Sequence, residues 1–363
     1  MHKEYSGKLI PMLIDGIHIP LTLPFTRDGG LYLRKLDYNV GRYSLTPATG
    51  FVSLSPDSEA DSLSDAEIED VLRVVSNSSA PEKVLIATIS KSSVRGALAI
   101  AELAATSGFD AVLLAAPPQS ANLSSDEHLL FFRAVADRSP LPVLLSSSAR
   151  SQECQLSVQL IAELARHPNV IGVYEDGLTL DRYNVIAAAT GDIHRSVTVT
   201  PVFAPVTRRM LTAGDLNSAS SAGFVTAESL ASGTAIAKFP SSSAMKTRSK
   251  TVGFQVIATG TVRGFVELLE AGAAGAMLAM SACAPQACHE AYTAFKDGDR
   301  ALAAEKGQRL IEADGVLSQA GIAGIKYGCD WNGYYGGSPR LPRLPLNAAS
   351  KTNVERVLAG IRN

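Results

Sequence analysis

Two short polar segments carry the chemistry that can be read from this chain of 363 residues. They comprise Ser146, Ser147, Ser148 and Arg150 in the first segment, and Tyr174, Glu175 and Asp176 in the second. A guanidinium can hold a carboxylate ligand. Tyr174 could act as a general acid or base if Arg150 lowered its pKa from the usual value of about 10. An equally good interpretation is that Tyr174 is a buried aromatic side chain that fills space.

Each polar segment follows an apolar run that predicts a buried parallel strand. Residues 141–145 form the first run, and residues 170–173 form the second. Between them, apolar residues recur at helical spacing over residues 156–164, and Pro168 ends the helix. A strand, helix and strand in this order predict two neighbouring parallel strands. We therefore expect Ser146 and Tyr174 to open on the same edge of the sheet.

The alternation of strand and helix continues on both sides of this unit. It predicts an α/β fold, a TIM (β/α)8 barrel, which commonly needs about 250 residues. The expected strands are residues 17–24, 43–46, 83–89, 110–115, 141–146, 170–174, 253–258 and 274–279. Three later segments with helical periodicity predict a C-terminal helical extension. We therefore assign residues 1–284 to the barrel and residues 285–363 to the C-terminal helical region.

About sixty residues, at 191–251, interrupt the barrel pattern. A loop of that length without structure is uncommon in a compact domain, so we expect the insertion to have its own elements. Its basic residues are Arg208, Arg209, Lys238, Lys246, Arg248 and Lys250. One interpretation is a solvated lid or an oligomer contact, and another is an anion-binding flap over the barrel mouth.

Several motifs resemble the dihydrodipicolinate synthase and N-acetylneuraminate lyase family, whose members are Schiff-base lyases and aldolases built on a TIM barrel. The segments LPVLLSSSA, LARHPN and VIGVYE align without a gap with the family patterns L-P-x-x-x-Y-N-x-P, L-A-x-x-P-N and I-x-G-x-K. LTLPF followed by TRDG, and GFDAVLLAAPP, match two further family motifs. The segment GIKYG matches the family's C-terminal A-x-K motif, which makes Lys326 a structural residue.

The resemblance places the family's two catalytic side chains on positions where this chain has other residues. The Schiff-base lysine falls on Tyr174 and the proton-relay tyrosine falls on Ser146, so these two residues occupy the catalytic positions. The imine is the electron sink of the family's carbon–carbon cleavage, and a tyrosine cannot form it. Lys238 could replace the lysine only if the insertion folded into the mouth; a surface lysine is the alternative.

The resemblance also suggests residues that bind the substrate. The family loop G-T-T-G-E, which holds the carboxylate of a 2-oxo acid, falls near residues 46–51, where Thr49 and Gly50 match and the glutamate is missing. A Thr-Gly turn is also ordinary loop chemistry. Arg150 stands one residue before the family's carboxylate-binding arginine. Thr259 and Gly260, after the seventh expected strand, complete the expected substrate-binding set.

Composition and charge exclude several classes of partner. The net charge is −2 and the sequence pI is about 6.3, which gives no electrostatic basis for binding nucleic acid or an anionic membrane. No apolar run approaches the roughly 20 residues of a membrane helix, so we expect a cytoplasmic protein.

Cys283, Cys288 and His289 could be zinc ligands, but an Ala-rich segment beside a strand favours core packing. We therefore expect no metal and no cofactor.

Two functions remain open. The first is a divergent lyase of the aldolase type that acts on a 2-oxo acid or sugar acid without a lysine imine. The second is a catalytically inactive relative that binds a small carboxylate ligand. The resemblance also implies a homo-oligomer, a dimer or a tetramer. Fold alone does not decide between the two functions.

Overall fold

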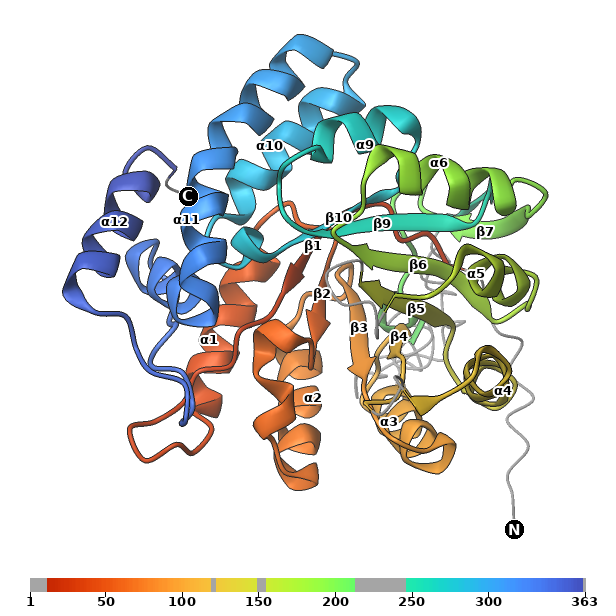
Figure 1. Cartoon of the computed structure of the whole chain (residues 1–363), viewed down its shortest axis with the longest axis horizontal. Helices are drawn as coiled ribbons and strands as arrows, with labels where there is room; N and C mark the ends of the chain where they lie inside the picture. The colour runs from red at the N-terminus through yellow and green to blue at the C-terminus, as the bar shows by residue number, and fades with distance from the viewer. Residues whose placement is uncertain (1–11, 119–121, 149–154, 213–245, 362–363) are drawn as a thin grey trace, which may run out of the picture.

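The computed structural model describes residues 12–118, 122–148, 155–212 and 246–361 of the chain. Eight parallel strands close into a barrel in the order β1-β2-β3-β4-β5-β6-β9-β10 (Figure 1). They are β1 Gly16–Pro20, β2 Gly50–Ser53, β3 Val84–Ile89, β4 Ala111–Ala115, β5 Val143–Ser148, β6 Val170–Asp176, β9 Gln255–Gly260 and β10 Gly275–Leu278. The predicted TIM barrel is confirmed.

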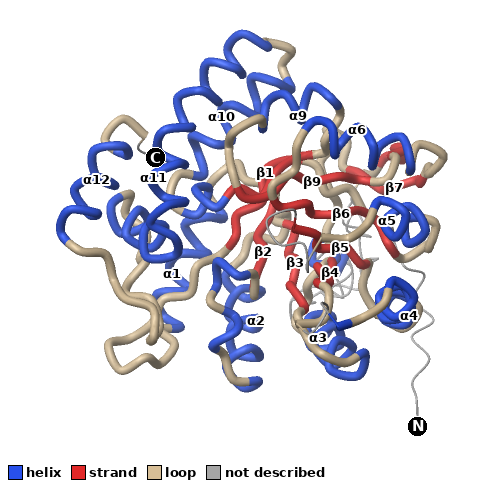
Figure 2. Tube along the Cα trace, viewed as in Figure 1, coloured by secondary structure: helices blue, strands red, loops and turns tan. Residues whose placement is uncertain are grey.

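Helices surround the strands on the outside of the barrel (Figure 2). They are α1 Leu33–Ser44, α2 Asp65–Ser78, α3 Val94–Thr106, α4 Ser125–Ala136, α5 Val158–Ala165, α6 Leu180–Ala189 and α9 Phe265–Ala271, with α10 Pro285–Lys296, α11 Arg300–Trp331 and α12 Ala348–Leu358 in the C-terminal region. Local chemistry sets several boundaries. Ser64 and Ser124 each accept a hydrogen bond from the backbone N–H three residues later, and the glutamate there bonds back to the serine N–H.

Apolar residues form two layers. The inner layer fills the barrel with side chains from alternate strand positions, among them Ile86, Leu113, Leu144 and Ile257, and Tyr174 belongs to this layer. The outer layer lies between the strands and the surrounding helices. Because successive strand residues point to opposite faces, a strand buried on both faces is apolar throughout. This is why the strand segments could be recognised as continuous apolar runs.

The second strand is not where the sequence pattern placed it. Residues 43–46, expected to be a strand, begin with the last two residues of α1, and β2 is Gly50–Ser53. Leu36, Val40 and Tyr43 are buried at helical spacing on α1. The short aromatic and apolar run therefore belongs to the buried face of a helix. The loop that follows β2 starts several residues later than expected.

The described part of the insertion lies at the N-terminal end of the barrel. β7 Arg195–Val199 and β8 Arg248–Val252 form an antiparallel ribbon, and Val197 and Val199 pack against Leu13. Arg209 donates to the backbone carbonyls of Ser76, Ser79 and Lys83, and Lys83 directly precedes β3. The interpretation that Arg208 and Arg209 belong to an anion-binding flap over the mouth, one of the two considered, is therefore wrong, since they anchor the chain at the opposite end. Lys238 lies outside the described residues.

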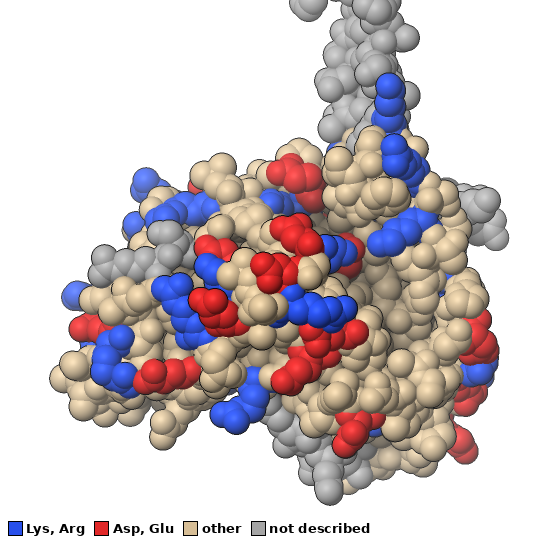
Figure 3. All heavy atoms as spheres, turned by 90° about the horizontal axis from the view of Figure 1, so that it is seen from above, with Lys and Arg blue, Asp and Glu red and all other residues tan. Residues whose placement is uncertain are grey.

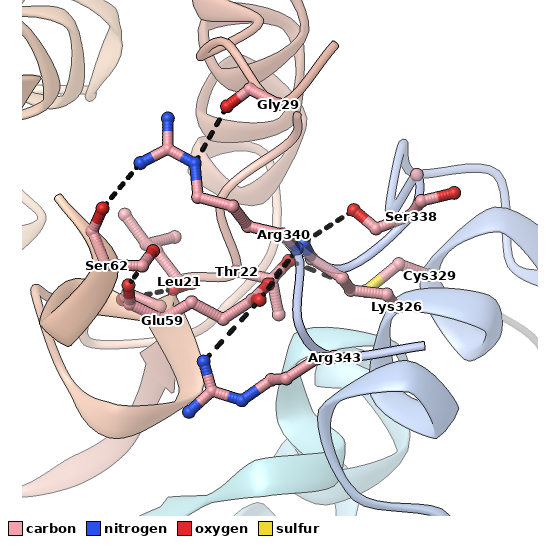
Figure 4. Close-up of polar contacts among 12 residues, drawn as sticks. Leu21, Thr22, Gly29, Glu59, Ser62, Lys326, Cys329, Ser338, Arg340 and Arg343 are labelled. Atoms are coloured by element: carbon pink, nitrogen blue, oxygen red, sulfur yellow. Dashed lines mark hydrogen bonds and ion pairs between the residues drawn. The ribbon is translucent and has the colours of Figure 1, made fainter. Parts of the chain in front are cut away.

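A buried ionic cluster fastens the C-terminal region to the loop after β2. This loop contains two short 3-10 helices, η1 Pro56–Ser58 and η2 Ala60–Ser62. The Lys326 ammonium lies 2.5 Å from the Glu59 carboxylate, and both side chains are fully buried (Figure 4). The Arg340 backbone N–H donates to the same carboxylate at 2.9 Å, and Lys326 also donates to the Ser338 carbonyl. Lys326 is thus structural, as the resemblance implied.

Charged side chains of both signs are interspersed on the face shown in Figure 3. That face carries no extended region of a single sign. Within the described ranges, no helix combines the length and the apolar character needed to cross a membrane.

Candidate functional site

A cavity of about 940 Å³ opens at the C-terminal ends of the barrel strands. The strands contribute Thr88, Ala115, Ser146, Tyr174, Thr259 and Met277, among others. The loop after β2 and the middle of α11 form its sides, through residues such as Leu54, Asp57 and Ile322. The C-terminal face is where TIM barrels place their binding groups. We therefore take this cavity as the candidate site.

Tyr174 lies at the floor of the cavity and is paired with a histidine. The Tyr174 hydroxyl lies 2.5 Å from Nδ1 of His18, and the two rings have centroids 5.9 Å apart. His18 belongs to β1 and is fully buried, and Tyr174 is 1% exposed. β1 and β6 are not neighbours in the barrel, so this hydrogen bond spans the interior.

Burial keeps both members of this pair uncharged. It lowers the pKa of His18 to about 4, an effect that the backbone of Ile14 offsets only in part. It raises the pKa of Tyr174 well above the usual value. The hypothesis that the pKa of Tyr174 is lowered is therefore wrong for this structure, and Arg150, the cation that was to lower it, lies outside the described residues. At neutral pH the floor holds a neutral imidazole and a neutral phenol.

β5 and β6 form one wall, as the sequence predicted. Ser146 is the direct neighbour of Tyr174 in a parallel pair. Two positions further, the Ser148 hydroxyl donates to the Asp176 carboxylate at 3.0 Å, and both residues line the cavity. A carboxylate and several hydroxyl groups thus lie above the phenol. This wall can bind hydroxyl groups and can take up a proton.

The residues between these positions, Ser147 and Glu175, are engaged by contacts outside the ligand space. Glu175, expected at the mouth, is fully buried on the outer face of β6, where the Arg182 guanidinium lies 3.3 Å from it. The Ser147 hydroxyl accepts the Leu156 backbone N–H at 3.1 Å. Side chains alternate across a strand, so Glu175 points away from the cavity, whereas Ser147 still contributes to the cavity lining. Glu175 is therefore a structural residue here.

Thr49 and Gly50, expected to bind a carboxylate, lie at the opposite end of the barrel. Gly50 opens β2 and pairs with His18 and Val84. A Cβ at Gly50 would lie 2.2 Å from the Val84 carbonyl oxygen, which explains the glycine. The loop at the mouth is instead Ser55-Pro56-Asp57-Ser58-Glu59. Its last residue, Glu59, is fully buried and lies 2.5 Å from the Lys326 ammonium.

The other expected contacts differ in their outcome. Thr259 and Gly260 end β9 and line the cavity. Lys91 and Arg343 also line it and were not identified from the sequence. Lys91 lies 3.1 Å from Asp65, and Arg343 lies 3.3 Å from Asp61. Lys91 could have been identified as a lining residue from its position just after β3. Nothing in the sequence indicates that Arg343 lies at the mouth.

His18 was the most important residue to be missed. It stands in an apolar run, I-H-I-P-L, and the alternation of that strand places it inside the barrel. Cys283 and Cys288, considered as zinc ligands, are fully buried in the outer apolar layer. Across the four described ranges, no three His, Cys, Asp or Glu residues are grouped so that they could hold a metal ion.

Comparisons with known proteins agree with this architecture. The family model for the dihydrodipicolinate synthetase family matches residues 13–219 and 236–361. A 4-hydroxy-tetrahydrodipicolinate synthase from Acidiphilium cryptum is 23% identical over 350 residues, which cover 96% of this chain and 99% of that protein. A synthase of the same name from Xanthomonas axonopodis matches over 60% of its own length.

Two further likenesses concern an aldolase and a solved structure. L-threo-3-deoxy-hexylosonate aldolase from Aspergillus niger is 24% identical over 268 residues, covering 73% of this chain and 68% of that protein. The structure of YagE, a prophage protein of the dihydrodipicolinic acid synthase family from E. coli K12 in complex with pyruvate, matches with a TM-score of 0.74. That match has 19% identity and covers 96% of this chain and 99% of that chain.

Proposed function

Because the chain belongs to the dihydrodipicolinate synthetase family, we propose that it is a lyase-type protein that binds a small hydroxylated acid at the barrel mouth without forming a lysine imine. The ligand class is a 2-oxo acid or a sugar acid. The relatives named as a synthase and as a 3-deoxy-hexylosonate aldolase support this class. The cavity of about 940 Å³ has room for such a ligand.

One observation supports the proposal that no lysine imine forms. The floor of the cavity holds the Tyr174 phenol, and the one amine among the described lining residues is Lys91. Lys91 lies in the loop after β3 and is paired with Asp65, so it is not part of the floor. An imine needs an amine at the reacting carbon, because the protonated imine accepts the electrons of the breaking bond. The described floor offers none.

A carbon–carbon cleavage without an imine needs a base and donors for an oxyanion. Asp176 is positioned to take the proton from a ligand hydroxyl. The bond between the hydroxyl carbon and its neighbour then breaks, and its electrons pass to the ligand's carbonyl oxygen. The hydroxyl groups of Ser146 and Thr259 are the donors we assign to that oxygen. The proton on Asp176 then returns to the enolate carbon.

The second candidate, a binding protein without catalysis, is favoured by the Tyr174 and His18 pair. The pKa of His18 is lowered to about 4 and that of Tyr174 is raised well above its usual value. A general acid or base works best with a pKa near the working pH. Neither member of the pair meets this condition. In this reading Tyr174, Ser146, Thr259 and Gly260 only hold the ligand.

Turnover separates the two candidates. We expect the protein to release pyruvate from 2-keto-3-deoxygluconate, measured with lactate dehydrogenase as the coupling enzyme. Asp176→Asn should lower the rate about 100-fold or more, since general base catalysis contributes at least that much. Asp181→Asn, a change on the exposed surface of α6, is the matched control and should leave the rate unchanged. Binding without release would instead favour the second candidate.

We also propose that the protein is a homo-oligomer, a dimer or a tetramer. Two large apolar side chains that lie close together in the chain and remain exposed, Leu341 and Leu344 at 76% and 73% exposure, support a subunit contact. Light scattering at micromolar concentration is the test. A mass equal to the 38.1 kDa monomer would contradict this proposal.

A further inference from the structure

The hydrogen bond at the cavity floor can run in either direction, and the acidity of its two groups decides which one is favoured. The Tyr174 hydroxyl can donate to Nδ1 of His18, or Nδ1–H can donate to the phenol oxygen. The other ring nitrogen, Nε2, has no hydrogen-bond partner among the described residues, so the direction is decided at Nδ1. A neutral phenol is a stronger acid than a neutral imidazole N–H, and an imidazole nitrogen is a stronger base than a phenol oxygen. The favoured arrangement is therefore a phenol that donates to Nδ1.

This direction determines what the phenol can offer a ligand. Tyr174 lines the cavity, whereas His18 is fully buried behind it. A tyrosine hydroxyl has one proton, and that proton points to His18. The phenol oxygen therefore turns only its lone pairs toward the ligand. A ligand carbonyl or carboxylate oxygen placed there would face lone pairs without a proton between them.

We infer that the cavity floor is a hydrogen-bond acceptor, and that the protein consequently selects ligands that present a hydroxyl group, rather than a carbonyl oxygen, to Tyr174. This inference rests on the proposed function and specifies its ligand. Asp176, on the same wall, is also an acceptor, since it receives the Ser148 hydroxyl at 3.0 Å. The cations that line the cavity, Lys91 and Arg343, lie on other elements. The ligand's carboxylate is thus directed toward them and its hydroxyl end toward the floor.

The first test compares two acids that differ at a single group. Lactate carries a hydroxyl where pyruvate carries a carbonyl, and titration calorimetry gives the affinity of the protein for each. We expect lactate to bind about three to ten times more tightly than pyruvate, the effect of one neutral hydrogen bond. In His18→Leu the tyrosine proton is released, so the preference should shift toward pyruvate. Tyr174→Phe should remove the preference.

Tyr183→Phe is the matched control. Tyr183 is a buried tyrosine of α6 that does not line the cavity, and its change should leave the ratio of affinities as it is. Tighter binding of pyruvate than of lactate by the unmodified protein would overturn the inference and leave the proposed function intact. Failure of both acids to bind would count against the proposed function and, with it, the ligand preference.

A second measurement tests the direction of the bond without any ligand. In the unmodified protein, ¹⁵N NMR of the His18 ring distinguishes a protonated from an unprotonated nitrogen. We expect an unprotonated Nδ1 and a protonated Nε2, and loss of the Tyr174 contact in Tyr174→Phe should change the Nδ1 shift. A protonated Nδ1 would overturn the inference even if His18→Leu fails to fold.

Discussion

The protein contains two buried polar pairs that serve different purposes. The Tyr174 hydroxyl and His18 Nδ1 lie 2.5 Å apart at the floor of the cavity, and the Lys326 ammonium and the Glu59 carboxylate lie 2.5 Å apart beside the mouth. The first pair is neutral at neutral pH, whereas the second is ionic. The neutral pair borders the ligand space, and the ionic pair connects α11 to the loop after β2.

The surroundings of each pair follow from its charge. Glu59 receives additional donors from Arg340, and Lys326 lies 4.4 Å from the centre of the Phe25 ring, because a buried charge requires compensation on every side. In the neutral pair, a single hydrogen bond pairs the Tyr174 hydroxyl with His18 Nδ1. Charged side chains outside the cavity therefore stabilise the mouth, while the floor of the cavity stays uncharged.

The largest expected effect is on the ionic pair. Lys326→Met leaves the Glu59 carboxylate buried without its main partner and should lower the free energy of unfolding by about 3–5 kcal/mol. Urea denaturation measures the change. Lys306→Met is the control, since Lys306 pairs with Glu290 at 2.7 Å on a partly exposed surface and should cost about 0–1 kcal/mol. Equal losses in the two variants would remove the distinction between the pairs.

The neutral pair should make the free energy of unfolding depend on pH. The pKa of His18 is lowered from 6.5 to about 4 in the folded state, so the unfolded state takes up a proton first as the pH falls. Stability should therefore decline between pH 6.5 and about 4, by a His18 contribution on the order of 3 kcal/mol. The pKa of Asp110 is raised to about 6, which acts in the opposite direction.

The effect of His18 is isolated by difference. His18→Leu removes the His18 contribution and keeps that of Asp110, so the difference in unfolding free energy between the two proteins should change across this pH window. Denaturation curves at pH 7 and pH 4.5 are sufficient. A constant difference would show that His18 is not held neutral.

Tyr174→Phe should have a smaller effect at neutral pH. It removes the one donor to His18 Nδ1 and leaves that nitrogen buried without a partner, a cost of about 1–3 kcal/mol. The loss should be below that of Lys326→Met, because no charge is left unpaired. Urea denaturation of both variants under the same conditions compares the two losses of stability. A larger loss for Tyr174→Phe would mean that the neutral pair, and not the ionic one, holds the barrel together.

Arg343 should contribute least to stability. Its guanidinium lies 3.8 Å from Glu59 and 3.3 Å from Asp61, and the side chain is 41% exposed. Arg343→Gln should change the unfolding free energy by about 0–1 kcal/mol. A thermal melt is the measurement, and a loss similar to that of Lys326→Met would assign Arg343 to the buried cluster.

The strands could be predicted wherever a continuous apolar run identifies them. The pairing of Ser146 with Tyr174 followed from one strand, helix and strand unit, and the structure has this pairing. Tyr43 was misplaced because the four residues 43–46 are too few to separate a strand from the buried face of a helix. The insertion could not be placed, since its anchors are bonds from Arg209 to distant backbone carbonyls.

The site could be predicted only in part. The alternation of side chains in a strand places Glu175 outside the barrel and His18 inside it. Glu175 was nevertheless expected at the mouth because it is charged, and His18 was missed because it stands in an apolar run. The partnership of His18 with Tyr174 depends on barrel closure, which brings β1 and β6 to face each other across the interior. Arg343 reaches the cavity through the fold of the C-terminal region, for which no local signal exists.

The most direct test of the account is reductive trapping. The protein is incubated with pyruvate and borohydride, and its intact mass is measured; Tyr174→Lys, alone and with Ser146→Tyr, serves as the variant in which an amine is present at the floor. We predict an unchanged mass for the unmodified protein and an adduct on the new lysine. A pyruvate adduct on the unmodified protein would contradict the account, and peptide mapping would then show whether Lys91, Lys238 or another lysine carries it.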